Sequence, residues 1–277
     1  MFCCKDQLGR DVVLNSYPAK RIISLVPSQT ELLYDLGLDE EVVGITKFCV
    51  HPVHWFRNKE RVGGTKNVNI EKVESLQADL ILANKEENMK EQIEQLEKIA
   101  PVWISDVTTF EDALQMIKNV SEITNTMEKA LTLITRITTN FSKLSHRVLH
   151  PTSNTQHPTS NVQLRTAYLI WHNPYMTIGG DTFISNMLSK CGLKNVFENL
   201  KRYPEISIEQ IASVNPQLIL LSSEPYPFKE KHVEELRPFF DKAKIFLVDG
   251  EMFSWYGSRM VYAPDYFASL MQNIENN

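Results

Sequence analysis

The 277-residue chain contains two matching stretches, Asn69-Ile-Glu-Lys-Val-Glu-Ser-Leu-Gln-Ala-Asp-Leu-Ile-Leu82 and Ser207-Ile-Glu-Gln-Ile-Ala-Ser-Val-Asn-Pro-Gln-Leu-Ile-Leu220. Aligned without gaps at an offset of 138 positions, they share six of their fourteen residues. Each stretch begins with a residue that favours a helix N-cap, continues with helical spacing and ends in an apolar run typical of a buried strand. The pair predicts a protein built from two related α/β halves.

A carboxylate occupies the same place in both stretches. Glu71 and Glu209 fall in the first turn of each predicted helix. The positive end of the helix dipole favours a negative charge there, by some tenths of a kcal/mol to about 1 kcal/mol. Helix stabilisation is thus one interpretation of both residues, and their matching places on two halves keep a second role open.

Composition and charge narrow the class of protein. The net charge is −5, with 43% hydrophobic and 23% charged residues, which is ordinary for a soluble globular protein and gives no indication of nucleic acid as a partner. No apolar run approaches the roughly 18 residues that span a bilayer. The first six residues lack the apolar core of a secretory signal, so we expect either a cytoplasmic protein or a sequence without its export segment.

The chain before the first copy of the repeat has the pattern of a strand, a helix and a strand. An apolar run at 21–26 is stopped by Pro27, and a second strand is expected at 41–46. Between them, the sequence from Ser28 to Glu31 matches a capping box that opens a helix, and Gly37 is a suitable C-cap. Such a unit within about 25 residues indicates a parallel sheet.

A long helix is expected between the two copies of the repeat. From 125 to 150 no strand pattern interrupts the chain, and apolar residues recur at intervals of three and four. At about 1.5 Å per residue the helix would be roughly 35 Å long. The apolar positions are Met127, Leu131, Ile134, Ile137, Phe141, Leu144 and Val148.

These patterns divide the chain into four parts. After the long helix, a polar heptad of turn-forming residues occurs twice in almost the same form, which favours a flexible surface loop over a metal site made of its two histidines. The predicted parts are an N-terminal lobe at 1–124, the helix at 125–150, an insertion loop at 151–164 and a C-terminal lobe at 165–277.

Aromatic side chains are frequent in the loops that follow the predicted strands. In parallel α/β sheets the ligand lies outside the carboxyl ends of the strands, so these loops predict a broad pocket for a large, flat or partly apolar ligand. The alternative is that the rings plug the bases of the loops. The candidate ligand-binding residues are His51, Trp55, Trp171, Tyr203, Phe253, Trp255 and Tyr256.

Two weaker motifs leave their chemistry open. Cys49, His51 and His54 have a spacing that would allow a thiolate and two imidazoles to converge on a transition metal, although no fourth ligand is near in sequence. A glycine pair at 179–180 precedes a predicted helix, where it would suit either an anion or a tight turn. The scattered cysteines form no disulfide framework. No catalytic motif is present, which favours a binding protein over an enzyme.

Taken together and in order, the segments resemble the helical-backbone class of substrate-binding proteins of ABC importers. Within that class the vitamin B12 binders are nearest, and the siderophore and haem binders are more distant. The similarity covers residues 10–275. The segments that carry it are 21–31, 69–82, 171–197 and 204–220.

The resemblance implies a fold and partners. The fold would be two Rossmann-like α/β lobes with parallel sheets, joined by one long backbone helix, with a ligand cleft between the lobes. Glu71 and Glu209 would dock onto arginines of the membrane permease. The protein would be a monomer that acts outside the cytoplasm, without a cofactor of its own.

The resemblance also implies a ligand. His51, Trp171 and Tyr203 stand where ring-bearing ligand contacts are expected, whereas Thr65 and Asn84 stand where the vitamin B12 binders carry tryptophans. A cobalamin or related corrinoid is the first choice, and an iron–siderophore or haem is the second. The alternative function is an intracellular enzyme or chaperone that handles a tetrapyrrole or metal through His51, His54 and His172, with Cys49 as a further candidate ligand.

Overall fold

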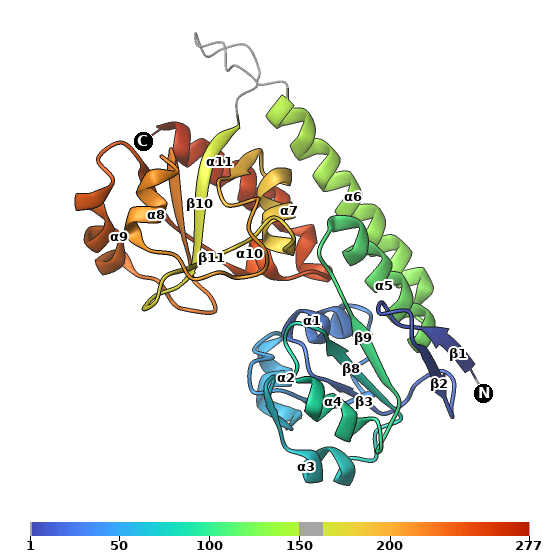
Figure 1. The fold of residues 1–277 in the computed structure, drawn as a ribbon. Coiled ribbons are helices and arrows are strands. Elements are labelled where there is room, and N and C mark those ends of the chain that lie inside the picture. The colour runs from blue at the N-terminus through green and yellow to red at the C-terminus, as the bar shows by residue number, and fades with distance from the viewer. Residues whose placement is uncertain (1, 150–162, 277) are drawn as a thin grey trace. The chain divides into compact units, whose positions relative to one another are not determined.

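The apolar run of the first copy of the repeat forms a strand with all five residues buried, β8 (Leu80–Asn84). It belongs to a five-stranded sheet in the computed structural model, which describes residues 2–149 and 163–276 (Figure 1). Every pairing in this sheet is parallel, as the sequence predicts. The strand order is β5 (Glu60–Arg61), β4 (Val42–Ile45), β3 (Ile22–Ser24), β8 and β9 (Val102–Ser105).

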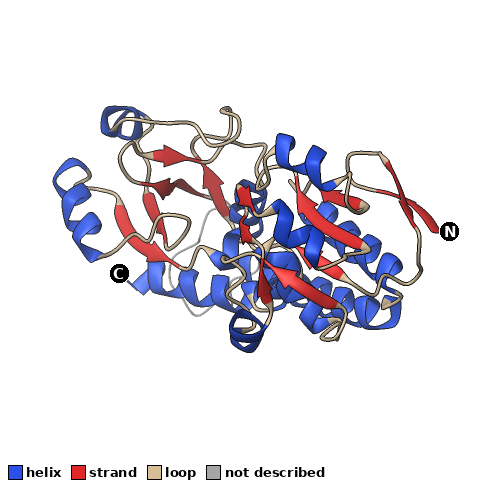
Figure 2. Cartoon of the chain, turned by 90° about the horizontal axis from the view of Figure 1, so that it is seen from below, coloured by secondary structure: helices blue, strands red, loops and turns tan. Residues whose placement is uncertain are grey.

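Helices and two small antiparallel pairs complete this part of the chain. Helices flank the strands of the sheet (Figure 2). A core of buried aliphatic side chains, which includes Ile23, Val73 and Ile81, fills the space between the sheet and the helices. The antiparallel pairs are β1 (Phe2–Lys5) with β2 (Asp11–Leu14) and β6 (Gly63–Gly64) with β7 (Asn67–Val68). The helices are α1 (Pro27–Asp35), α2 (Val53–Asn58), α3 (Ile70–Ser75), α4 (Lys90–Leu96) and α5 (Phe110–Thr124).

The second copy of the repeat supplies the matching strand of a second sheet, which is mixed. That strand, β13 (Leu218–Ser222), is again buried at all five positions. The sheet order is β11 (Met176–Thr177), β10 (Leu164–Trp171), β13 and β14 (Lys244–Val248), and β12 (Leu193–Asn195) also pairs with β10. Only β11 is antiparallel to its neighbour. The helices are α7 (Phe183–Lys190), α8 (Ile208–Ser213), α9 (Glu230–Leu236), α10 (Glu251–Ser254) and α11 (Ala263–Asn276), with short 3₁₀ turns at Arg237–Phe239 and Ser258–Val261.

The two copies of the repeat fold identically, element by element. The helices α3 and α8 and the strands β8 and β13 have the same bounds when shifted by 138 positions. Asn69 and Ser207 both cap their helices, each accepting a hydrogen bond from an amide three residues later. Gln77 and Asn215, also 138 apart, both take the left-handed backbone conformation after the helix, with φ of 50° and 45°. The repetition seen in the sequence is therefore a repetition of structure.

The predicted long helix is α6 (Met127–Leu149). The chain forms two compact units, and α6 belongs to the first as far as Thr135 and to the second from Arg136. The predicted insertion loop lies outside the described residues except for its last two. Among the helices of the described residues, none combines the length and the apolar character needed to cross a membrane.

The capping box predicted at Ser28 is wrong. Helix α1 already starts at Pro27, its N-cap is Val26, and no side chain caps it. Proline suits the first helical position because its fixed φ is helical and its missing N–H would have no partner there. Ser28 is therefore inside the helix and buried, and Glu31 is available for another contact.

That contact comes from the C-terminal part of the chain. The first unit comprises residues 1–107 and 111–135 together with the segment 255–259, which the sequence places in the C-terminal lobe. Arg259 donates two hydrogen bonds to the Glu31 carboxylate, of 2.6 and 2.8 Å. Both side chains are mostly buried, so the ion pair is shielded from solvent. Burial raises the pKa of Glu31, and the hydrogen bonds from Arg259 oppose that effect.

Replacing Arg259 with methionine should destabilise the protein by about 3 kcal/mol at pH 7, because the buried carboxylate of Glu31 loses its partner. The pKa of Glu31 in the folded protein is already raised, so protonation of Glu31 favours the folded state. This contribution to stability is present below the ordinary glutamate pKa and is lost as the pH rises through the folded-state pKa. Without Arg259 the folded pKa rises further, and the stability deficit should therefore be smaller at pH 4. Urea denaturation at both pH values measures this.

The double variant Glu31→Gln, Arg259→Met is the matched control. It should regain most of the lost stability at pH 7, because no charge remains buried. A deficit of equal size at pH 4 and pH 7 would contradict the interpretation.

Candidate functional site

The two matching carboxylates are both exposed on short helices. Glu71 lies in the first turn of α3, and Glu209 lies in the first turn of α8. The hydroxyl of Ser207 and the main-chain amide of Glu209 lower the pKa of the Glu209 carboxyl, which keeps it ionised. Each unit thus presents one exposed glutamate in the first turn of a short helix.

In the first unit, His51 and Trp255 lie together. Their rings meet edge to face, with centroids 5.5 Å apart, and the guanidinium of Arg259 lies over the indole at 4.7 Å. His51 is half-buried, whereas Trp255 is only 7% exposed. The ion pair with Glu31 therefore holds an aromatic pair in place, and of the two rings His51 has the more accessible surface.

Tyr256 is buried beside the carboxyl ends of β8 and β9. Its hydroxyl donates to Glu87 at 3.4 Å, and burial raises its pKa. Asn84, which ends β8, is also buried, and its side-chain amide donates to Ser105 at the end of β9. Asn84 thus supports the loop through a network of hydrogen bonds, a task for which an amide is suited and an indole is not.

Two of the sequence candidates belong to the interior. Trp55 is 1% exposed, and its indole N–H donates to Asp39. Phe253 is fully buried and packs against Tyr168 and Phe267. Neither ring offers a surface to a ligand in this conformation, and their packing accounts for their presence without one.

In the second unit, Trp171 has the most accessible aromatic ring among the candidates. It is the last residue of β10 and is 39% exposed. Tyr226, in the loop after β13, meets it edge to face at 5.7 Å. Tyr203 is half-buried in a segment whose backbone bonds to Thr177 and Gly179, so it lies beside β11. Trp171 and Tyr226 both follow the carboxyl ends of parallel strands, where ligands of such sheets bind.

A polar and aromatic cluster supports the loop after Trp171. Glu235 of α9 accepts hydrogen bonds from His172 at 3.1 Å and from Tyr175 at 2.9 Å. His232, one helical turn earlier, bonds to the hydroxyl of Tyr226 at 3.0 Å. The histidine and tyrosine donors lower the pKa of Glu235, whereas burial is the main cause that lowers the pKa of His232. Three side-chain contacts, Glu235 with His172, Glu235 with Tyr175 and His232 with Tyr226, thus tie helix α9 to the two loops.

Sequence reasoning missed the contribution of helix α9. His232 and Glu235 stand three residues apart and so share one face of the helix. That spacing is the only local signal, and it is common on exposed helices. Their partners lie 6 to 63 residues away in sequence, so only the fold brings the cluster together.

The 49–54 loop does not form a metal site among the described residues. Cys49 is buried and bonded to the hydroxyls of Thr30 and Thr46, and burial raises the pKa of its thiol to about 11. His54 is exposed and faces the ring of Tyr34. In the part of the chain that the structure covers, no three histidine, cysteine or acidic side chains come close enough to hold a metal ion.

The glycine pair at 179–180 allows its backbone to lie close to the backbone of residues 198–202. Both amides donate to main-chain carbonyls, Gly179 to Arg202 and Gly180 to Leu200. A Cβ atom on Gly180 would come within 2.1 Å of the carbonyl oxygen of Glu198. The two amide groups are thus already used, and the tight-turn interpretation of the motif holds.

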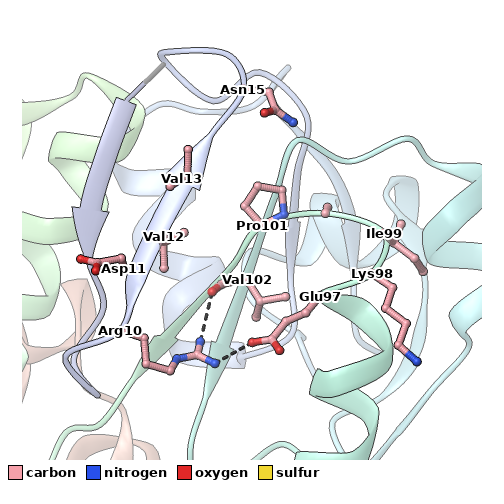
Figure 3. Close-up of a pocket in the computed structure, with 11 residues that line it drawn as sticks. Arg10, Asp11, Val12, Val13, Asn15, Glu97, Lys98, Ile99, Pro101 and Val102 are labelled. Atoms are coloured by element: carbon pink, nitrogen blue, oxygen red, sulfur yellow. Dashed lines mark hydrogen bonds and ion pairs between the residues drawn. The ribbon is translucent and has the colours of Figure 1, made fainter.

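A surface pocket of about 480 Å³ lies beside the N-terminal hairpin (Figure 3). The guanidinium of Arg10 donates to Glu97 at 2.6 Å and to the carbonyl of Val102 at 3.3 Å. Val102 is the first residue of β9, so the pocket is at the amino end of that strand. Ligands of parallel sheets bind at the opposite edge, so this pocket is not where the fold predicts a ligand.

The fold is that of the two-lobed periplasmic binding proteins. Residues 22–238 match the model of the periplasmic binding protein family, and the chain therefore belongs to that family. Its members bind substrates for transport and are not enzymes. The enzyme alternative raised by the 49–54 loop is not supported.

Individual relatives lie at moderate distance. A vitamin B12-binding protein of Photorhabdus laumondii is 28% identical over 93% of this chain and 88% of its own length. Among solved structures, the periplasmic vitamin B12-binding protein of Vibrio cholerae aligns with a TM-score of 0.77 at 22% identity, covering 94% of this chain and 99% of that one. The molybdate-binding protein of a Haemophilus influenzae ABC transporter aligns with a TM-score of 0.79 at 18% identity, covering 100% and 92%. The fold is thus shared by proteins with very different ligands.

The contact between Glu235 and the 172–175 loop should depend on pH. Because the folded-state pKa of Glu235 is lowered, its contribution to stability is present above the ordinary glutamate pKa and is lost as the pH falls through the lower folded value. Glu235→Gln should therefore reduce stability by some tenths of a kcal/mol at pH 6, and by nothing measurable at pH 3. Denaturant unfolding at the two pH values measures the difference. Glu234→Gln, on the neighbouring exposed residue, should change stability at neither pH.

Proposed function

We propose that this protein is the extracytoplasmic substrate-binding component of an ABC importer, and that its ligand is a cobalamin or a related corrinoid. The observation that carries the proposal is the placement of ring-bearing side chains at the carboxyl ends of parallel strands, with Trp171 exposed at the end of β10. A large, partly apolar ring system matches such a lining. The relative from Photorhabdus laumondii, similar over nearly the whole chain, supports the same ligand class.

The residues proposed to contact the ligand are those with accessible rings. Trp171, Tyr203 and His51 keep part of their surface exposed, and Trp255 acts mainly by holding His51. Thr65 is half-buried, and Asn84 is engaged in the loop network. Corrinoid binding would therefore rest on fewer large rings in the first unit than in the vitamin B12 binders that the chain resembles.

We propose that Glu71 and Glu209 are the contacts with the membrane permease. Both are exposed, both lie in the first turn of a helix of six residues, and both occupy the same place in a repeated unit. A partner with two matching cationic surfaces would recognise such a pair through charge-assisted hydrogen bonds. The protein would act as a monomer, with one copy docking on one transporter.

Titration with cyanocobalamin, hemin and a ferric siderophore, followed by tryptophan fluorescence, tests the ligand. Cyanocobalamin should bind most tightly, and Trp171→Ala should weaken that binding about tenfold, equivalent to about 1.4 kcal/mol. Trp103→Phe is the matched control, because Trp103 is a buried residue of β9 and its replacement should leave the affinity unchanged. Absence of binding by all three compounds would rule out the metal-chelate class.

Replacing both Glu71 and Glu209 with alanine tests the docking contacts. The double variant should bind cyanocobalamin as the native protein does, and it should lose at least nine-tenths of the uptake of labelled cobalamin by cells that depend on this protein. The matched control is Glu74→Ala with Glu234→Ala, which removes the same charge from exposed positions of α3 and α9. Normal uptake with the first double variant would refute the docking role.

A further inference from the structure

An arginine at the amino end of a neighbouring strand donates hydrogen bonds to carbonyl groups at the C-terminal end of each repeated helix. In the first unit, Arg21 directly precedes β3. Its Nε atom donates to the carbonyls of Leu76 and Gln77, both at 3.1 Å, and its Nη2 atom donates to Leu76 at 2.6 Å. Leu76 is the C-cap of α3, so the guanidinium binds the carbonyls that the end of the helix leaves without partners.

The second unit repeats this arrangement with its own arginine. Arg165, in β10, donates through Nη2 to the carbonyl of Val214. Val214 is the C-cap of α8 and stands 138 positions after Leu76, so it is the equivalent residue. β10 pairs with β13 as β3 pairs with β8, which makes the two arginines equivalent in the sheets as well.

The main chain around both arginines is held in the same way. The amide of Arg21 donates to the side chain of Asp79 at 2.9 Å, and the amide of Asp79 donates back to the carbonyl of Arg21 at 2.9 Å. Arg165 makes the same reciprocal pair with Gln217, at 3.0 and 2.8 Å. Asp79 and Gln217 are again 138 positions apart. Asp79 and Gln217 thus make the same pair of hydrogen bonds with the main chain of the arginine, although their side chains differ.

Helices as short as α3 and α8 need such anchors. Isolated helices of fewer than about 12 residues are not stable in water, and these have six residues each. Each buries only one side chain fully, Val73 in α3 and Ile211 in α8. The N-cap holds one end of each helix. The guanidinium holds the other, where the negative end of the helix dipole favours a cation.

We propose that Arg21 and Arg165 are positioning residues of the permease-docking surface. Each fixes the last turn of a helix whose first turn carries a docking carboxylate, and each ties that helix to a central strand of its sheet. The orientation of Glu71 and Glu209 toward a cationic partner surface is thereby set by the two sheets. The inference rests on the proposed docking role of these two glutamates.

Hydrogen exchange tests the anchoring without any partner. In Arg21→Met, which keeps the length of the side chain but removes its donors, the peptide covering residues 70–79 should exchange at least fivefold faster, and the peptide covering 208–217 should be unchanged. Arg165→Met should give the reverse pattern. In Arg21→Lys the 70–79 peptide should exchange at an intermediate rate. An ammonium group lacks the planar arrangement of N–H donors with which the guanidinium binds two carbonyls. Arg57→Met and Arg237→Met remove exposed cations from the same units and should change neither peptide.

Docking affinity tests the consequence for the partner. The protein is titrated onto its permease complex in lipid nanodiscs, and Arg21→Met or Arg165→Met should weaken binding at least fivefold while cyanocobalamin affinity stays within twofold of the native value. In the Glu71→Ala background, Arg21→Met should cause no further loss, because the arginine acts through that glutamate. If Arg21→Met instead disturbed the whole unit, its loss of docking affinity would add to that of Glu71→Ala.

The outcomes separate the two proposals. If Glu71→Ala weakens docking and Arg21→Met does not, the inference is overturned and the docking role stands. Additive losses in the double variant, or unchanged exchange in both arginine variants, overturn it as well. If Glu71→Ala and Glu209→Ala leave docking unchanged, the docking role itself fails and this inference fails with it.

Discussion

Parallel pairing of two fully buried strands, β8 with β3 and β13 with β10, is the constraint on which the rest of the structure depends. A parallel partner can be reached only by a crossover, so a helix must precede each of these strands. The same pairing gives each sheet two chemically distinct edges. Loops with aromatic rings follow the carboxyl ends of the strands, and arginines stand at the amino ends of β3 and β10. The aromatic loops and the arginines thus lie at opposite edges of each sheet.

The distribution of aromatic residues shows how one sequence feature serves two purposes. Trp55 and Phe253 complete the interior of their units, whereas Trp171 and His51 keep accessible surface. The accessible rings are held by their neighbours. Glu235 binds His172 in the loop after Trp171, and the ring of His51 packs against the indole of Trp255. Fixed rings lose little conformational freedom when a ligand arrives, which favours tight binding.

The sequence predicts the parallel α/β architecture and the repeated helix and strand, because caps, apolar runs and helical spacing are local signals. It also predicts the long helix to within two residues at each end. The capping box at Ser28 was misleading because Pro27 starts the helix one residue earlier, which local spacing does not resolve. Which aromatic rings are buried depends on contacts such as Trp55 with Asp39, and the ion pair of Glu31 with Arg259 joins residues 228 positions apart. No local pattern encodes such distant partners.

The segment 255–259 has a consequence for the order in which the protein forms during synthesis. Domains usually fold as the chain leaves the ribosome, with the N-terminal one first. Here the first unit contains residues that are made almost last, since Trp255 and Arg259 belong to it. Until they emerge, Glu31 lacks the guanidinium of Arg259 and the carboxyl end of β8 lacks the cover of Tyr256. The first unit therefore cannot complete its set of contacts until nearly the whole chain has been made.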